Sequence, residues 1–311
     1  MTDPCFLLIR FAAIGDCVMA AWAATSIKLA HPGSTIVWPI EERCSPVVDG
    51  ELAVSEIFPR ERWKENRWSA STWREQIHKY AKLRRWSFDF GIDLHGHLKS
   101  SLCLRLACPR RRLAAKANDE ISKRLNPCLP STGDPMHMVE WNQFALNQLG
   151  EFPMPERPMM PFTVGAVDPC KITISLGASE ADKKYPLDSW RQVAAHLIGD
   201  GFDVRFLGGP NDASITGLGM DLVGKLTLRE SMNEIASSRL HLAADTGSGH
   251  IAAAYGVPVV SIFGRTDPAR FRPYTPFGEV LRNGDVPSNV PYEEVISAAY
   301  RLLEASHAVS H

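Results

Sequence analysis

The sequence predicts an α/β protein made of two domains with parallel sheets, and three observations carry this prediction. Short apolar runs alternate with amphipathic segments of helical period along most of the 311 residues. A proline-rich stretch without helical period, 151–170, separates the two halves. Each half opens with an apolar run, then small residues, then a helical segment. Alternating strands and helices are typical of parallel sheets covered by helices.

The apolar runs and the periodic segments give the expected elements in order. Strands are expected at 6–9, 35–38, 90–93, 172–176, 204–207, 241–244 and 259–263. Helices are expected at 20–30, 71–85, 189–199, 231–238, 250–255 and 291–305. We therefore expect a first domain over 1–150, a linker over 151–170 and a second domain over 171–290. We expect the remaining segment, 291–311, to form a C-terminal helix that packs back on the first domain.

The composition excludes several classes of protein. Hydrophobic residues make up 45% of the chain and charged residues 22%, which is typical of a globular protein. The formal net charge of −1 argues against a nucleic-acid partner. The seven cysteines contain no CxxC pair, which argues against a disulfide framework or a structural zinc site and favours a reducing compartment.

The N-terminal apolar run is not expected to be a targeting segment. It begins with acidic Asp3 instead of a basic region, and Arg10 and Asp16 interrupt it. The chain also lacks the run of about 18 apolar residues that a membrane-spanning helix needs. We therefore expect a cytoplasmic enzyme.

Two loops of the second half carry groups suited to a nucleotide. In "SLGASEADKKYP", Gly177 and Ser179 allow a ligand to approach closely, and the charge of Lys183 suits a phosphate. In "FLGGPNDASI", Asn211 and Asp212 can meet sugar hydroxyls. The alternatives are a solvated lysine pair in the first loop and a helix cap in the second.

A third loop, "ADTGSGH", follows the strand expected at 241–244. Asp245, Thr246 and Gly247 precede a helix of small residues that includes His250. A helix start of this kind presents backbone N–H groups to a diphosphate; the alternative is that Asp245 or Thr246 only caps the helix. Three such loops together favour a nucleotide site over three coincident caps, although none matches the P-loop or the GxGxxG fingerprint.

Two loops of the first half also follow predicted strands. In "RFAAIGDCV", the Asp16 carboxylate is either a catalytic group or a cap for the helix that follows. "GIDLHGHLKSS" carries His95, Gly96, His97 and Lys99. The two histidines lack a third metal ligand nearby, so hydrogen bonding or phosphate contact is expected of them.

Basic residues interleaved with tryptophans form a further candidate site at 59–86. This pattern suits an anionic lipid surface or an acceptor that carries carboxylates and phosphates. A solvated helix with an apolar stripe explains most of 71–85. We therefore assign acceptor binding only to the early part, at Arg60, Arg62 and Lys64.

Four of these stretches resemble motifs of one enzyme family. "LLIRFAAIGD" resembles the N-terminal signature of the family 9 glycosyltransferases, the bacterial ADP-heptose:lipopolysaccharide heptosyltransferases, and most closely that of heptosyltransferase I. "DLHGHLKS" resembles the acceptor-side loop of the family, and "GASEADKKYPLDSW" its first donor-domain loop. "DTGSGHIAAAYGVPVVSIFGRTDPARFRPY" resembles its most characteristic stretch. The matches run in order from about Phe6 to Tyr274.

The resemblance implies a GT-B fold, in which two Rossmann-like domains face a central cleft. It implies transfer of L-glycero-D-manno-heptose from ADP-heptose, with inversion, to a Kdo-lipid A type acceptor in synthesis of the lipopolysaccharide inner core. The enzyme would then be cytoplasmic and peripheral on the inner face of the inner membrane. Two positions depart from the family pattern: Asn211 stands where glutamate is expected for the nucleoside, and "GSGH" replaces Gly-Pro-Ser-His.

The resemblance also implies residue roles. Asp16 is the expected general base, and Lys183 is the expected phosphate-binding catalytic group. The expected donor-binding residues are Gly177, Ser179, Asn211, Asp212, Asp245, Thr246, Gly247 and His250. The expected acceptor-binding residues are Arg60, Arg62, Lys64, His95, Gly96 and Lys99.

The chemistry agrees with these roles. In an inverting transfer, one base removes the proton of the acceptor hydroxyl, and cations or N–H groups stabilise the departing diphosphate. The chain contains no Asp-x-Asp pair, so we expect no metal cofactor. Two alternatives remain: a transferase of the same fold that uses another nucleotide sugar, and a non-catalytic nucleotide-sugar-binding protein. A Rossmann oxidoreductase is disfavoured because the glycine fingerprint is missing.

Overall fold

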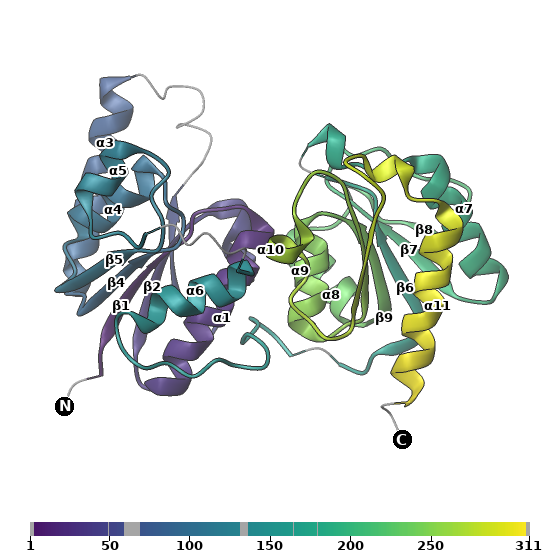
Figure 1. The fold of residues 1–311 in the computed structure, drawn as a ribbon, viewed down its shortest axis with the longest axis horizontal. Coiled ribbons are helices and arrows are strands. Elements are labelled where there is room, and N and C mark those ends of the chain that lie inside the picture. The colour runs from purple at the N-terminus through teal and green to yellow at the C-terminus, as the bar shows by residue number, and fades with distance from the viewer. Residues whose placement is uncertain are drawn as a thin grey trace. The chain divides into compact units, whose positions relative to one another are not determined.

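The computed structural model describes residues 3–48, 50–58, 69–130, 136–163, 165–178 and 180–308. The chain divides into two compact units, Met1–Phe162 and Thr163–His311. Each unit is a parallel sheet between layers of helices (Figure 1). Within the described residues, no helix is long and apolar enough to cross a membrane.

The first unit is built around a five-stranded sheet in the order β3-β2-β1-β4-β5. The strands are β1 (Cys5–Ile9), β2 (Thr35–Glu41), β3 (Val54–Phe58), β4 (Phe90–Asp93) and β5 (Arg111–Ala114). The helices are α1 (Ile14–Ala30), α3 (Ala70–Lys82), α4 (Leu98–Ala107), α5 (Glu120–Leu125) and α6 (Met138–Asn147), with short 3₁₀ turns η1 (Glu42–Val47) and η2 (Leu83–Trp86).

Helices cover both faces of this sheet. Helices α1 and α6 pack together on one face, whereas α3, α4 and α5 cover the other (Figure 1). Strand β1 is central, so its side chains are buried on both faces: Leu7 and Ile9 join one core, and Phe6 packs on the other side against Phe152. A continuous apolar run is typical of such a doubly covered strand.

The second unit is a six-stranded sheet in the order β11-β10-β9-β6-β7-β8. Its strands are β6 (Asp168–Ser175), β7 (Asp203–Leu207), β8 (Met220–Asp221), β9 (Ser238–Ala244), β10 (Val259–Phe263) and β11 (Gly278–Arg282). Its helices are α7 (Leu187–Gly199), α8 (Leu228–Ala236), α9 (Gly247–Tyr255), α10 (Pro268–Phe271) and α11 (Tyr292–Ala308), with 3₁₀ turns η3 (Ala181–Lys183) and η4 (Pro287–Asn289). Helices α7 and α11 pack together over one face, and α8 and α9 over the other (Figure 1).

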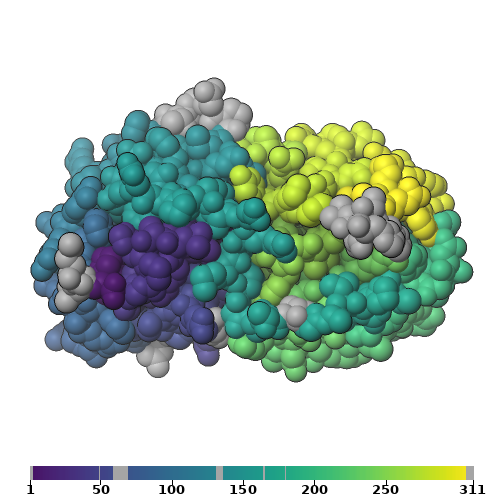
Figure 2. All heavy atoms as spheres, turned by 90° about the horizontal axis from the view of Figure 1, so that it is seen from below, coloured from purple at the N-terminus to yellow at the C-terminus, as the bar shows by residue number. Residues whose placement is uncertain are grey.

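The predicted linker is shorter in the structure than in the sequence prediction. Residues 151–162 belong to the first unit, because Ser26 Oγ donates a hydrogen bond to the Pro153 carbonyl (2.7 Å) and Met159 N–H donates to Thr25 Oγ1 (2.8 Å). Figure 2 shows teal residues of this range beside purple N-terminal residues. Because β6 already begins at Asp168, only residues 163–167 lie between the end of the first unit and the first strand of the second.

The C-terminal helix does not have the packing that we expected. The sequence predicts that 291–311 packs on the first domain, but α11 buries Val295, Ala298, Ala299 and Leu303 in the core of the second unit. The amphipathic pattern correctly predicts a helix with one apolar face. It does not specify the partner of that face, and α7 with the adjacent sheet supplies it.

Candidate functional site

The sheet order creates a ligand-binding position in the second unit. Strand β6 comes first in the sequence and lies inside the sheet. Strands β7 and β8 follow on one side of it, and β9, β10 and β11 lie on the other side. Neighbouring strands β6 and β9 therefore lead into connections that leave in opposite directions. In sheets of this kind, ligands bind at the carboxyl ends of the strands at this switch point.

Two predicted donor-site residues meet at this position. Lys183 lies at the end of η3, after β6, and Asp245 follows the last residue of β9. Lys183 Nζ donates a hydrogen bond to Asp245 Oδ2 over 2.9 Å, within an ion pair. The Asp245 side chain is only 10% exposed and that of Lys183 28%, so Lys183 is the more exposed partner of the pair.

The start of helix α9 lies beside this pair. Thr246 is the N-cap residue and has an extended backbone, and Gly247 is the first helical residue. Among the described residues, the Thr246 side chain accepts no hydrogen bond from a backbone N–H group of the first turn. Its Oγ1 instead shares a hydrogen bond with Ser248 Oγ (2.9 Å). The alternative that Thr246 is merely a side-chain cap is thus not supported. The first N–H groups of the helix suit an anion.

Asp212 organises the loops around this site. Its carboxylate accepts a hydrogen bond from the Gly209 N–H (2.9 Å) and pairs with Lys184 (3.0 Å). A Cβ atom on Gly177 would lie 1.9 Å from Asp212 Oδ2, so the absence of a side chain at Gly177 lets the loops after β6 and β7 approach each other. Its neighbour Asn211 is exposed.

His250 has a different environment from the other predicted donor-binding residues. It lies on α9 and is only 6% exposed, so its imidazole is part of the interior of the unit. Ser179 was also predicted for the donor site, and it lies outside the described residues.

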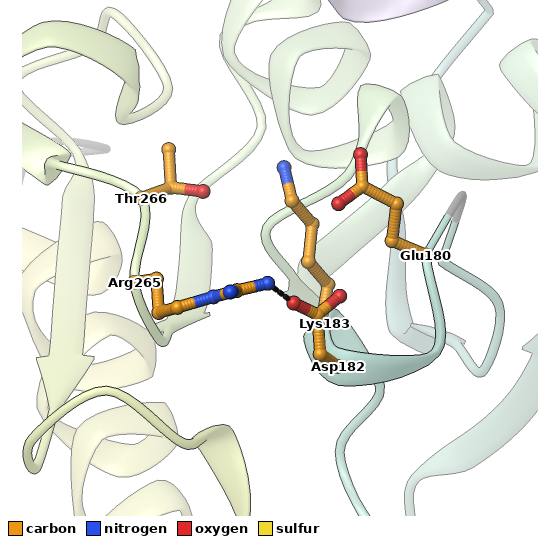
Figure 3. Close-up of a pocket in the computed structure, with 5 residues that line it drawn as sticks. All are labelled: Glu180, Asp182, Lys183, Arg265 and Thr266. Atoms are coloured by element: carbon orange, nitrogen blue, oxygen red, sulfur yellow. Dashed lines mark ion pairs between the residues drawn. The ribbon is translucent and has the colours of Figure 1, made fainter.

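A pocket of about 270 Å³ opens beside Lys183 (Figure 3). Its other lining residues are Glu180, Asp182, Arg265 and Thr266, and Arg265 forms an ion pair with Asp182. We did not predict these four residues. Asp182 is adjacent to Lys183 in the sequence, and Arg265 and Thr266 lie in the longest family-like stretch. Their places in these two stretches were the features of the sequence that could have indicated a role in the site.

The first unit has a switch point of the same kind between β1 and β4, where Ile9 is paired with Asp93. Arg10 follows β1 and is buried, and its Nη1 donates a hydrogen bond to the carbonyl of Leu94, after β4 (2.7 Å). The Arg10 guanidinium forms an ion pair with Asp16. Arg10 thereby ties the two loops together and holds the carboxylate, a role that the sequence did not reveal.

Asp16 also contributes to the start of α1. Its Oδ2 accepts a hydrogen bond from the Ala13 N–H at 3.2 Å, so the helix-cap alternative is present in the structure. Its side chain nevertheless remains 27% exposed. A capping role and a chemical role are therefore compatible for this carboxylate.

The loop after β4 is organised by Asp93. Its buried carboxylate accepts hydrogen bonds from the N–H groups of His95 (2.8 Å) and Gly96 (3.0 Å). Burial raises the pKa of Asp93, whereas these hydrogen bonds act to lower it. Gly96 has φ of +78°, and a Cβ atom there would lie 2.9 Å from the carbonyl oxygen of Lys116, so this turn requires glycine.

The two histidines of this loop lie side by side, with ring centroids 5.0 Å apart. Burial, and then the positive charge of Arg10, lowers the pKa of His95 to about 3. Burial, and then the charge of Lys116, also lowers the pKa of His97. His95 is therefore neutral near pH 7 and suits hydrogen bonding, whereas half-buried Lys99 supplies a positive charge.

The remaining acceptor-side predictions cannot be placed. Arg60, Arg62 and Lys64 lie outside the described residues. Across the part of the chain that the structure describes, no group of three or more His, Cys, Asp or Glu side chains is arranged to hold a metal ion.

Comparison with known proteins identifies the family. The model of glycosyltransferase family 9 (heptosyltransferase) matches residues 74–290, which is more than half of the chain. The chain belongs to glycosyltransferase family 9. The resemblance predicted from the four motifs is therefore confirmed, and the protein is a family 9 glycosyltransferase.

Relatives and solved structures agree with this family 9 assignment. The chain is 26% identical to lipopolysaccharide heptosyltransferase 1 of Pseudomonas aeruginosa, over 84% of this chain and 79% of that protein. It is 23% identical to lipopolysaccharide heptosyltransferase 1 of Escherichia coli K12, over 84% and 88%.

The fold is similar to that of E. coli heptosyltransferase WaaC with ADP. The TM-score is 0.80 and the identity 20%, over 96% of this chain and 99% of that one. E. coli ADP-heptose lps heptosyltransferase II gives a TM-score of 0.76 and 19% identity, over 97% and 99%. These similarities confirm the predicted GT-B fold class of two parallel α/β units.

Proposed function

We propose that this family 9 glycosyltransferase transfers L-glycero-D-manno-heptose from ADP-heptose to a Kdo-lipid A type acceptor during synthesis of the lipopolysaccharide inner core. The observation that carries the proposal is the Lys183–Asp245 pair beside the start of α9, at the switch point of the second sheet. A cation beside helical N–H groups suits a diphosphate. The donor sugar is supported by two lipopolysaccharide heptosyltransferase 1 relatives and by a similar fold solved with ADP-2-deoxy-2-fluoro heptose.

The proposed reaction is a single displacement with inversion. The acceptor hydroxyl oxygen attacks C1 of the donor sugar, its proton passes to the Asp16 carboxylate, and the bond from C1 to the diphosphate oxygen breaks. ADP leaves with the electron pair, and Lys183 and the N–H groups of α9 stabilise its charge. The partly exposed side chain of Asp16, held by Arg10, supports its role as the base.

We assign the loop after β4 to the acceptor. The loop with His95, Gly96 and Lys99 begins at Leu94, whose carbonyl accepts a hydrogen bond from Arg10, and His95 lies within the electrostatic influence of both Arg10 and Asp16. A Kdo-lipid A type acceptor carries carboxylates and phosphates, for which Lys99 offers charge and His95 a neutral hydrogen-bonding group. With Arg60, Arg62 and Lys64, this loop would hold an acceptor at the cytoplasmic surface of the inner membrane.

We further propose that the reaction needs no metal cofactor, because Lys183 and α9 provide the positive groups at the diphosphate and the sequence lacks an Asp-x-Asp pair. Transfer measured with EDTA should equal transfer measured with Mg²⁺. If the protein loses activity on extensive dialysis against EDTA and regains it only when Mg²⁺ is added, this part of the proposal is refuted.

The central experiment measures transfer from ADP-heptose to a Kdo-lipid A acceptor and assigns the anomeric configuration of the product by NMR. We expect turnover and an inverted anomeric centre; a retained configuration would exclude the single displacement. A thermal-shift series with ADP-, GDP- and UDP-sugars tests the donor, because only a ligand that binds the folded state raises the unfolding temperature. Binding without turnover would favour the non-catalytic alternative, and a larger shift with GDP or UDP another donor.

The acceptor assignment has its own test. Neutralising Arg60, Arg62 and Lys64 together should raise the KM for the acceptor and leave the KM for the donor unchanged. A defect confined to the donor KM would contradict the assignment of these residues.

A further inference from the structure

The pocket beside Lys183 is closed on one side by the ion pair between Asp182 and Arg265 (Figure 3). Asp182 lies in η3, after β6, and Arg265 follows β10. Strand β9 lies between β6 and β10 in the sheet. The ion pair therefore spans the carboxyl end of β9, where Asp245 and the start of α9 lie.

The loop that carries Arg265 is held firmly by its backbone. A Cβ atom on Gly264 would lie 2.7 Å from the carbonyl oxygen of Asp285, so the chain packs closely against the segment before η4. On the other side, Asp267 caps α10 by accepting a hydrogen bond from the Ala269 N–H (3.0 Å). The Arg265 side chain itself is 70% exposed. A fixed backbone with an exposed side chain leaves the guanidinium able to change partner.

Both cations of this pocket are paired with a carboxylate. Lys183 pairs with Asp245, and Arg265 pairs with Asp182, whose side chain is 42% exposed. The Arg265–Asp182 pair is exposed, and exposed ion pairs contribute little to stability, so a change of partner for Arg265 costs little free energy. A guanidinium can bind a phosphate through two parallel hydrogen bonds, which makes a diphosphate a stronger partner than a single exposed carboxylate.

We propose that Arg265 is a further donor-binding residue, whose guanidinium leaves Asp182 and binds the diphosphate of a nucleotide sugar held at Lys183 and the start of α9. This inference rests on the proposed function, because it takes a nucleoside diphosphate as the ligand. Asp182 then acts as a competitor that occupies Arg265 until the donor arrives.

Calorimetric titration with ADP, AMP and adenosine tests the proposal on the full chain. R265Q should weaken ADP binding about tenfold, as expected for one charge-assisted hydrogen-bonding group, with a smaller effect on AMP and none on adenosine. R265K should recover part of the loss. D182N should strengthen ADP binding several-fold, because it removes the competing carboxylate.

R301Q is the matched control. Arg301 is also exposed and paired, with Glu279 on β11, so this substitution removes one positive charge from the same unit away from the pocket. ADP affinity should be unchanged in R301Q. All variants should unfold at the wild-type temperature, because each changes an exposed side chain.

Two results would overturn the inference: wild-type ADP affinity in R265Q, or a loss of affinity in D182N as large as that in R265Q. The second would mean that the ion pair itself shapes the site. If the wild-type chain binds GDP or UDP instead of ADP, the donor in the proposed function is wrong, and the same variants titrated with that nucleotide decide the role of Arg265. If the wild-type chain binds none of the three, both proposals fail.

Discussion

The two switch-point sites share a topology but differ in how their charged groups are held. In the first unit, the loop carboxylate Asp16 is partly exposed and its cation, Arg10, is buried. In the second unit the arrangement is reversed, because Asp245 is nearly buried and Lys183 is the more exposed partner. The same sheet order thus presents a carboxylate in one unit and a cation in the other. This difference corresponds to the two needs of the proposed reaction, a base and a group that stabilises the leaving diphosphate.

Removing the partly exposed carboxylate of Asp16 should have the largest effect, which is on turnover. We expect Asp16→Ala to lower kcat by about 10²–10⁴-fold, the range expected for a lost general base, while ADP binding remains near wild type. Turnover assays and calorimetry together separate these effects. Because Asp16 accepts the Ala13 N–H and also pairs with the buried Arg10 guanidinium, the variant should lose more stability than the about 1 kcal/mol of a lost helix cap, which thermal unfolding will detect. Wild-type turnover in this variant would exclude Asp16 as the base.

Removing the more exposed cation, Lys183, should have the next largest effect, which is on binding of the nucleotide donor. We expect Lys183→Ala to weaken ADP binding by about 10–100-fold, because it removes a charge-assisted hydrogen bond to phosphate. Lys184→Ala is the matched control, because Lys184 is the neighbouring lysine and pairs with Asp212. We expect a smaller loss there. Equal affinities in both variants and the wild type would show that Lys183 pairs with Asp245 but does not bind the donor.

A substitution at Gly96 tests whether the loop after β4 needs its tight turn. Gly96→Ala forces a side chain into the left-handed region and against the Lys116 backbone, so we expect a loss of about 1–3 kcal/mol in the free energy of unfolding. Gly199→Ala is the control, because Gly199 ends α7 and a Cβ atom there meets nothing within 4 Å. We expect acceptor KM to rise in Gly96→Ala while ADP affinity, which depends on the second unit, is retained. A parallel loss of ADP affinity would contradict this separation of the two sites.

The smallest expected effect concerns pH. The pKa of His95 is about 3 in the folded chain, below its unfolded value, so the unfolded chain binds more protons between these two values. The stability contributed by neutral His95 is complete above about pH 6.5 and is lost as the pH falls toward 3. We therefore expect His95→Gln to reduce the acid sensitivity of unfolding by no more than about 1.4 kcal/mol per pH unit, the limit for one proton. Denaturant titrations from pH 7 to about pH 4 measure this slope.

The sequence predicted the central strands well and the edge strands poorly. The buried runs of β1, β4, β9 and β10 were all predicted, whereas β3, β5, β8 and β11 were not. Strand β3 illustrates the reason: it is an edge strand whose Val54 and Ile57 are exposed, so it lacks a buried run. An edge strand is defined by its pairing with a neighbour, which is a tertiary property.

The candidate sites show the same division. The sequence located the loops, because a strand end followed by Gly, Lys or Asp is a local pattern. The Lys183–Asp245 pair joins residues 62 apart, and only the neighbouring positions of β6 and β9 in the sheet bring them together. The roles of Arg10 and Arg265 depend on contacts of that kind as well, so neither was predicted.

The sequence by itself determined the two α/β units, the family and the loops that carry charged groups. The spacing of apolar residues and the composition of strand ends are local patterns, which can be seen in consecutive residues. Only the tertiary structure decided that α11 completes the second core, that 151–162 belongs to the first unit, and that each loop charge has a specific partner. The physical reason is that period specifies which face of an element is apolar, whereas strand order and packing decide which element meets that face and which charges lie within contact distance.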